Sequence, residues 1–265
     1  MKSFKNNKFF NLLRHINRII RKLLKNLNIK LSHEDNLYPA ILLFHLSKLY
    51  SLSIVSYYLM KKKYSRESDI ILRSFWETYV NLFYISQKPK IRSHQYRMDE
   101  VQTIIARNNI QVKYNDEEAQ IINSIHIEEA IIELEKVKKY LMKIDSETDY
   151  EKFKWKSISV ETKSRELGLS EDYDFIYRSF SKITHPSSTT GQNYIATKKD
   201  IVKSIVPVKF IDKMIPAKVL FISLYLIKTL TLIHEDFDLK SDYRFLNKKI
   251  LDSLTSYFNI LNSEI

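Results

Sequence analysis

Glycine is almost absent from this chain of 265 residues: only Gly168 and Gly191 occur. Glycine adopts positive backbone φ angles without steric cost, so a fold with many tight turns or a Gly-lined phosphate loop is disfavoured here. Apolar side chains recur instead at helical spacing along most of the chain. We therefore expect an all-α fold, a helical bundle of about seven to nine helices.

Start and stop signals divide the chain into successive helices. Pro39 suits a helix start, Ser65 can cap the next helix, and Gly168 suits the position just past a helix end. Residues 144–157 and 186–200 are expected to be loops. The expected helices cover residues 9–27, 38–61, 66–86, 90–108, 116–143, 158–167, 171–185, 217–236 and 242–261.

Several functional classes are excluded or disfavoured by composition. The absence of cysteine excludes disulfides, thiolate zinc sites and a cysteine nucleophile. No signal peptide is predicted, because basic residues interrupt the apolar positions near the start. Residues 217–233 are the most membrane-like, but they contain Lys218 and Lys228, which favours a buried core helix. We expect a cytoplasmic protein that needs no cofactor.

The net charge of +12 is concentrated near the N-terminus, since residues 1–30 hold nine Lys or Arg and no Asp or Glu. This segment is amphipathic, and its basic side could bind RNA, an acidic partner protein or, as a weaker interpretation, an anionic membrane surface. A core-packing helix with a solvated basic side is an equally open interpretation. We treat residues 1–36 as a basic helix with its linker and residues 37–265 as a single helical domain. The basic residues are Arg14, Arg18, Arg21, Lys22 and Lys25.

Arg178 and His185 are the candidates for catalysis. Seven positions correspond to two helical turns, which place the side chains about 20° apart around the axis and roughly 10 Å apart along it. Pro186 predicts that the helix ends at His185, where unpaired carbonyls favour the imidazolium. A proton shuttle and a cation for the developing phosphorane charge are what metal-free RNA cleavage requires. The alternative is a capping histidine and an ordinary surface arginine. Ser181 and Lys182 fall near the same face.

Two groups of residues resemble known helical proteins. Arg178, six further residues and His185 are similar to the Arg-x4-6-His signature of the HEPN superfamily, the "higher eukaryote and prokaryote nucleotide-binding" proteins. More specifically, the chain resembles a bacterial family of uncharacterised helical proteins bordering on that superfamily. That likeness rests on an early segment, Arg73-Ser-Phe-Trp-Glu77-Thr-Tyr-Val-Asn-Leu, and on later residues, and it extends from about residue 40 to residue 200. The later residues are Tyr177, Ser181, His185 and Pro186.

The resemblance implies a HEPN-like core that forms a homodimer through the motif helix. It also implies a metal-independent endoribonuclease of toxin–antitoxin or antiphage systems, with an antitoxin or operon protein as a possible partner. Arg178 and His185 would be catalytic, while Tyr177, Ser181 and Lys182 would support them. The commonest HEPN form has four intervening residues, whereas this chain has six, with Ser179 after the arginine. The alternative function is a non-catalytic binding or sensor module of a defence system.

Arg73 and Glu77 are four positions apart in an otherwise apolar helix, which predicts a partly buried ion pair. The pair either holds the bundle in register or lines the same cavity as His185 and tunes it. Other acidic and histidine clusters lack the spacing of a metal site, so no metal is expected. His45 lies within a very apolar helix and is expected to be a core histidine.

Overall fold

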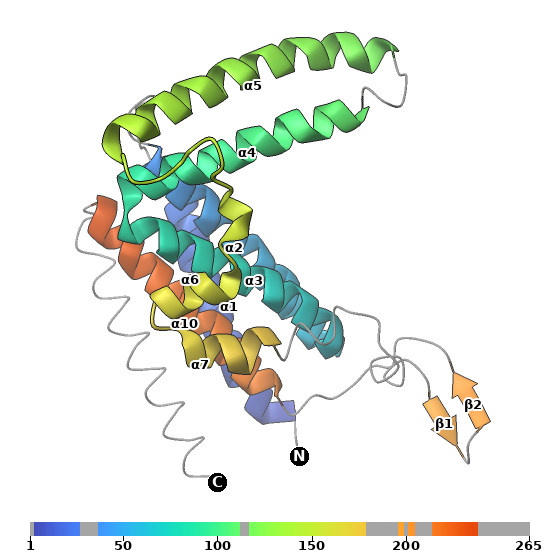
Figure 1. The fold of residues 1–265 in the computed structure, drawn as a ribbon. Helices are drawn as coiled ribbons and strands as arrows, with labels where there is room; N and C mark the ends of the chain where they lie inside the picture. The colour runs from blue at the N-terminus through green and yellow to red at the C-terminus, as the bar shows by residue number, and fades with distance from the viewer. Residues whose placement is uncertain are drawn as a thin grey trace. The chain divides into compact units, whose positions relative to one another are not determined.

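The computed structural model describes residues 3–26, 37–111, 117–178, 196–198, 201–204 and 214–237. Within these ranges the protein is almost entirely helical, which confirms the predicted all-α class (Figure 1). The α-helices are α1 (Ser3–Asn26), α2 (Tyr38–Lys61), α3 (Ser65–Gln87), α4 (Pro89–Gln111), α5 (Glu117–Ile144), α6 (Val160–Glu166), α7 (Ser170–Asp172) and α10 (Ile215–Phe237).

Three shorter elements complete the description: a 3-10 turn, a π-helix and a two-stranded ribbon. The ribbon pairs β1 (Ala196–Lys198) with β2 (Ile201–Ser204) in antiparallel fashion. It begins inside residues 186–200, which were expected to be a loop, because strands this short carry no readable alternation of apolar and polar residues. The 3-10 turn is Trp155–Ser157, and the π-helix is Tyr173–Tyr177.

Most predicted helix boundaries within the described ranges lie within three residues of the structure, but α1 begins at Ser3, six residues before the predicted start, and the predicted end at residue 185 lies outside the described residues. The predicted range 38–61 coincides with α2, and the last predicted helix, 242–261, lies outside the described residues. Gly168, with φ 70°, ends α6 as predicted. Its N–H donates to the Arg165 carbonyl, and the next N–H, of Leu169, donates to the Ser164 carbonyl. These two bonds form the Schellman arrangement that satisfies the last carbonyls of a helix.

The turn after α2 closes in the same way without a glycine. Lys63 adopts φ 68° and donates its N–H to the Met60 carbonyl, while the N–H of Tyr64 donates to the Leu59 carbonyl. A residue with a Cβ is strained at this φ. The tight connection between α2 and α3 therefore carries a steric cost at Lys63. The turn after α6 avoids this cost because Gly168 has no Cβ.

Two compact units make up the chain. The first contains Met1–Ile29, Leu42–Tyr79 and Glu171–Ile265, and the second contains Lys30–Ile41 and Val80–Ser170. In the first unit α1 packs against α10. The apolar side of α1 is thus part of a core, while its basic side is exposed. Fully buried side chains at this packing include Leu13, Ile16 and Ile20 of α1 and Val219, Ile222 and Leu226 of α10.

Aromatic rings of α3 and α10 form the centre of the first unit. The rings of Trp76 and Tyr79 stack at 5.8 Å, and Tyr225 meets them edge-on at 5.1 and 4.4 Å. A buried ion pair lies on the same two helices, with Nζ of Lys218 2.5 Å from Oδ1 of Asp69. Lys218, a charge within an apolar helix sequence, is therefore accommodated in the core by a carboxylate.

The second unit is built on α4 and α5, which pack side by side (Figure 1). In the same unit, Tyr84 and Trp155 meet edge-on with their ring centres 5.5 Å apart. Buried Arg92 lies over the Tyr84 ring at 3.5 Å, and buried Lys163 lies over the Trp155 ring at 4.1 Å. These cation–π contacts stabilise charged groups that the core would otherwise exclude.

Two of the described helices, α2 and α10, are long and apolar enough to cross a membrane, judged by length and composition. In α10, 61% of the apolar window is buried inside the protein, as a core helix requires, whereas in α2 only 44% is buried. His45 of α2 is buried and meets the Phe44 ring edge-on, which confirms it as a core histidine.

Candidate functional site

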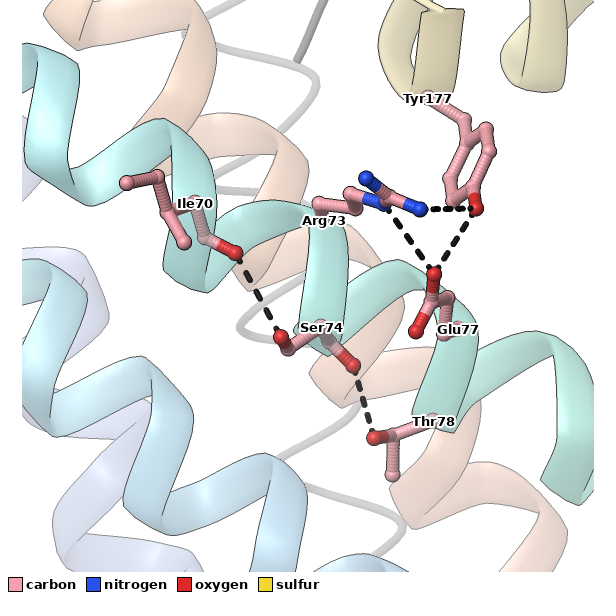
Figure 2. A network of polar contacts seen from close by, with 6 residues as sticks. All are labelled: Ile70, Arg73, Ser74, Glu77, Thr78 and Tyr177. Atoms are coloured by element: carbon pink, nitrogen blue, oxygen red, sulfur yellow. Dashed lines mark hydrogen bonds and ion pairs between the residues drawn. The ribbon is translucent and has the colours of Figure 1, made fainter. Parts of the chain in front are cut away.

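A three-residue polar network joins the two sequence segments that carried the resemblance (Figure 2). Arg73 and Glu77 form the predicted ion pair on α3, with Nε and Oε1 3.2 Å apart. Tyr177 reaches this pair from the π-helix, about a hundred positions later. Its hydroxyl donates to Glu77 Oε1 at 2.8 Å and accepts from Arg73 Nη2 at 3.0 Å. The guanidinium also lies over the Tyr177 ring, 5.0 Å from its centre.

The neighbouring hydroxyl groups on α3 contact backbone carbonyls of the same helix. Thr78 Oγ1 donates to the Ser74 carbonyl at 2.8 Å, and Ser74 Oγ approaches the Ile70 carbonyl at 3.5 Å (Figure 2). These groups use their hydrogen-bonding capacity locally. The polar connection drawn in Figure 2 between α3 and the later segment is therefore made by Arg73, Glu77 and Tyr177.

The protonation states of the network follow from its surroundings. Burial raises the pKa of Tyr177, and the hydrogen bond to Glu77 raises it further. Burial by itself lowers the pKa of Arg73, but the contacts with Tyr177 and Glu77 outweigh it, so the net pKa is raised. Tyr177 thus stays a neutral phenol and Arg73 a guanidinium, and the hydrogen bonds among the three side chains satisfy one another.

The π-helix, Tyr173–Tyr177, gives the segment its wider turn. Its buried members are Tyr173 and Ile176, and the Tyr173 ring stacks on the Tyr177 ring at 5.0 Å. Single π turns inside helices occur frequently at functional sites. Its last residue, Tyr177, lies in the polar network, whereas the next residue, Arg178, is exposed.

Arg178 presents its guanidinium to solvent, with 56% of the side chain exposed. Its Nε lies 3.0 Å from Oδ1 of Asp174, which is 53% exposed. Tyr173 and Ile176 of the same segment are buried, so one side of its described part packs into the core while Arg178 lies on the exposed side. An exposed ion pair of this kind contributes about 0–1 kcal/mol and is readily exchanged for another anion.

Asp172, beside the π-helix, also contributes to the site, although no sequence pattern indicated this residue. Burial raises the pKa of Tyr225, and a hydrogen bond with Asp172 raises it further. Burial likewise raises the pKa of Tyr79, with a smaller contribution from Asp172. Asp172 therefore ties the start of the motif segment to the aromatic core of α3 and α10. No sequence signal links residues so far apart in the chain.

The remaining predicted residues are distributed as follows. His185, Ser181 and Lys182 lie outside the described residues, so the pairing of Arg178 with His185 stays a prediction. Among the residues that the structure describes, no three His, Asp or Glu side chains are grouped as a metal site would need. The basic face of α1, which is exposed at every position, consists of Arg14, Arg18, Arg21, Lys22 and Lys25.

Fold and site together define an all-α protein in which an Arg–Glu–Tyr network fastens a late helical segment to an early helix. The chain belongs to a family of unknown function (DUF5677), whose model matches residues 40–202, more than half of the chain. The matched range contains the whole network and both candidate catalytic residues, while α1 and α10 lie outside it. No curated protein and no solved structure matches the chain.

Proposed function

We propose that this protein is a metal-independent endoribonuclease, an effector of toxin or antiphage systems that acts in the cytoplasm as a homodimer with a HEPN-like core. The observation that carries the proposal is the placement of Arg178. It follows directly on Tyr177, which Arg73 and Glu77 hold, and its guanidinium faces solvent. A phosphate-binding cation is most useful when its backbone is fixed and its side chain is accessible.

In the proposed reaction His185 accepts the proton of an RNA 2′-hydroxyl, and the oxygen attacks the adjacent phosphorus. Arg178 neutralises the charge that develops on the phosphorane. The imidazolium so formed returns its proton to the leaving 5′ oxygen, so each composite site needs one His185 and one Arg178, which come from different protomers. The products are a 2′,3′-cyclic phosphate and a 5′-hydroxyl, and no water or metal ion is consumed.

The ion pair of Arg178 with Asp174 is compatible with this role. Because both side chains are more than half exposed, solvent screens their attraction, and a phosphate oxygen can replace the Asp174 carboxylate. The carboxylate then acts as an internal substitute for the anion in the absence of RNA. Asp174→Asn would remove the negative charge at this contact and should tighten RNA binding.

The test incubates purified full-length protein with total RNA in the presence of a chelator and follows RNA degradation. The wild type should cleave, whereas Arg178→Ala and His185→Ala should not. Arg165→Ala is a matched control, because Arg165 is also exposed and also pairs with an acid four positions earlier, Glu161. Cleavage that persists in Arg178→Ala, or that stops equally in Arg165→Ala, would contradict the proposal.

The composite dimer site has a test of its own. Inactive Arg178→Ala protein and inactive His185→Ala protein are mixed and re-equilibrated so that heterodimers form. If the Arg178 and His185 of one site come from different protomers, one of the two sites in each heterodimer keeps both native groups. Partial recovery of cleavage is the expected result. No recovery, with heterodimers demonstrated by mass, would place both groups within one protomer.

A second candidate is a non-catalytic helical binding or sensor module of a defence system. The favouring observation is that Arg178 is already paired and that Arg73, Glu77 and Tyr177 satisfy one another, as a purely structural bundle would require. The two candidates differ in their effect on cells. Expression of the nuclease should arrest growth, and His185→Ala should relieve the arrest, whereas equal growth of both strains favours the module.

A further inference from the structure

The exposed side of α1 carries basic and neutral polar residues. The exposed positions from residue 11 to residue 25 are Asn11, Arg14, His15, Arg18, Arg21, Lys22 and Lys25. At 100° per residue, the three arginines and Lys25 fall within about 60° around the helix axis. At 1.5 Å per residue they extend over roughly 16 Å along it. The basic face of α1 is therefore a continuous row of cations and not a set of scattered charges.

The basic face of α1 has no acidic partner within the described part of the chain. The helix contains no Asp or Glu, and none of the five residues of the face forms an ion pair with a residue that the structure describes. Arg14 Nη2 donates to a neutral partner, Oδ1 of Asn11, at 2.9 Å. By contrast, other exposed cations pair with an acid three or four positions away, as Lys152, Arg165 and Arg178 do. The charge of α1 therefore remains available to an anion from outside the protein.

The apolar side of α1 is not available for insertion into a membrane. Leu13, Ile16 and Ile20 are fully buried, and α1 packs against α10. A helix that binds a membrane surface inserts its apolar side between the headgroups and the acyl chains. From residue 9 to residue 25, all exposed side chains of α1 are charged or neutral polar. This face therefore suits a hydrated polyanion better than a lipid surface.

The arginines of this face favour phosphate as the anion. A guanidinium is a planar fork that binds two phosphate oxygens at once. Proteins that bind a single strand place such cations along its backbone. A row with about one cation per helical turn can contact several successive phosphates.

We propose that the basic face of α1 binds the phosphodiester backbone of RNA, as a second contact in addition to Arg178. That the bound RNA is also the substrate rests on the function proposed above. Backbone contacts carry no sequence information, so this face sets the affinity for RNA and not the position of cleavage. Since α1 lies outside the range matched by the family model, the contact is an addition to the segment that contains the candidate catalytic residues.

The test measures binding of the full chain to a fluorescent single-stranded RNA oligonucleotide by anisotropy at several salt concentrations. The protein carries His185→Ala so that the RNA stays intact. Adding Arg14→Gln, Arg18→Gln and Arg21→Gln should weaken binding at low salt by about tenfold or more. The slope of log affinity against log salt should become shallower by about 2, because each phosphate contact to a single strand contributes about 0.7. All three arginines are exposed, so the variant should keep the circular dichroism spectrum of its parent.

The control is a matched triple substitution on α5, Lys136→Gln with Lys139→Gln and Lys143→Gln. These exposed lysines also share one side of a helix, and their replacement changes the net charge by the same amount. The same helix exposes Glu129 and Glu135, so its lysines offer a polyanion no field of one sign. The α5 variant should keep the affinity and the salt dependence of its parent.

The proposal is overturned if the α1 variant keeps the affinity and slope of its parent, or if the α5 variant loses as much. It is also overturned if the α1 substitutions abolish binding to phosphatidylglycerol vesicles and leave RNA binding unchanged, because the face would then belong to a lipid surface. Protein with native His185 that cuts no RNA, while RNA binding still depends on α1, would contradict the nuclease proposal alone and support this binding site.

Discussion

Tyr177 holds its position in the network through one hydroxyl, which donates to Glu77 and accepts from Arg73. Because the phenol satisfies two partners that are themselves only partly exposed, its removal leaves hydrogen-bonding capacity of both unmet. Tyr177, the residue before Arg178, is thus held in place by hydrogen bonds as well as by packing. The proposed function depends on this residue-scale arrangement.

Tyr177→Phe should lower the free energy of unfolding by about 1–2 kcal/mol, the usual cost of losing such bonds to charged groups. Chemical denaturation measures the change. Tyr58→Phe is the control, since the exposed Tyr58 should tolerate the loss within about 0.5 kcal/mol. A double-mutant cycle of Tyr177→Phe with Glu77→Gln should give a nonzero coupling energy. Equal effects of the two Tyr→Phe changes would contradict the role of the hydroxyl.

A second tyrosine makes the second unit sensitive to alkali. Burial and the 2.5 Å hydrogen bond that its hydroxyl donates to Asp145 together raise the pKa of Tyr150 to about 12. A phenol whose folded-state pKa lies above its unfolded value near 10 stabilises the fold fully below that pH. The stability should fall as pH rises from about 10 to about 12, and Tyr150→Phe should flatten this part of the curve. An unchanged slope in the variant would refute the assignment.

At the scale of elements, the two Schellman turns differ in one respect: the residue with positive φ is Lys63 after α2 and Gly168 after α6. Lys63→Gly should stabilise the protein by up to about 1 kcal/mol, because the strain is relieved at some cost in unfolded-chain entropy. Gly168→Ala should destabilise it by about 1 kcal/mol, through strain alone, since no atom lies within 4 Å of the new methyl group. Thermal unfolding of both variants measures the changes, and a shift of the same sign in both would contradict this account.

Most helices of the described part could be predicted from the sequence because periodicity, caps and breakers are local signals. The range 38–61 was predicted to the residue, and Gly168 marked the end of α6. The π-helix was not predicted, because one extra residue per turn leaves no mark in an apolar pattern. Lys63 gave no turn signal either, since lysine rarely adopts positive φ.

The candidate site was predictable in part for the same reason. Arg73 and Glu77 are neighbours on one helix, so their pairing followed from spacing. The contacts of Asp172 with Tyr225 and of Asp69 with Lys218 depend on tertiary packing between distant segments, for which a single sequence holds no signal. The resemblance to known helical proteins indicated Tyr177 as a site residue. The structure shows that its hydrogen-bond partners are Glu77 and Arg73.

At the scale of the whole molecule, α1 belongs to the core of the first unit. Its apolar face packs on α10, and both helices lie outside the range matched by the family model. The range matched by the family model therefore accounts for only part of the core that this chain builds. Because α1 is part of the core, the role of its basic face has to be tested by substitutions and not by deletion.

Deletion of residues 1–30 should destabilise the first unit severely, because each buried Leu or Ile that is lost contributes about 1.5–3 kcal/mol. The loss of fold would then obscure any loss of binding. Arg14→Gln with Arg18→Gln should instead keep the wild-type melting temperature to within a few degrees. Circular dichroism melts compare the two, and a deletion variant as stable as the wild type would contradict the core role of α1.

The chemistry of the product ends decides whether Arg178 and His185 have the proposed role of cutting RNA without a metal ion. Purified protein, total RNA and excess chelator should yield 2′,3′-cyclic phosphates and 5′-hydroxyls, and His185→Ala should yield neither. Intact RNA with the wild-type protein, or ends bearing 3′-hydroxyls and 5′-phosphates, would contradict it.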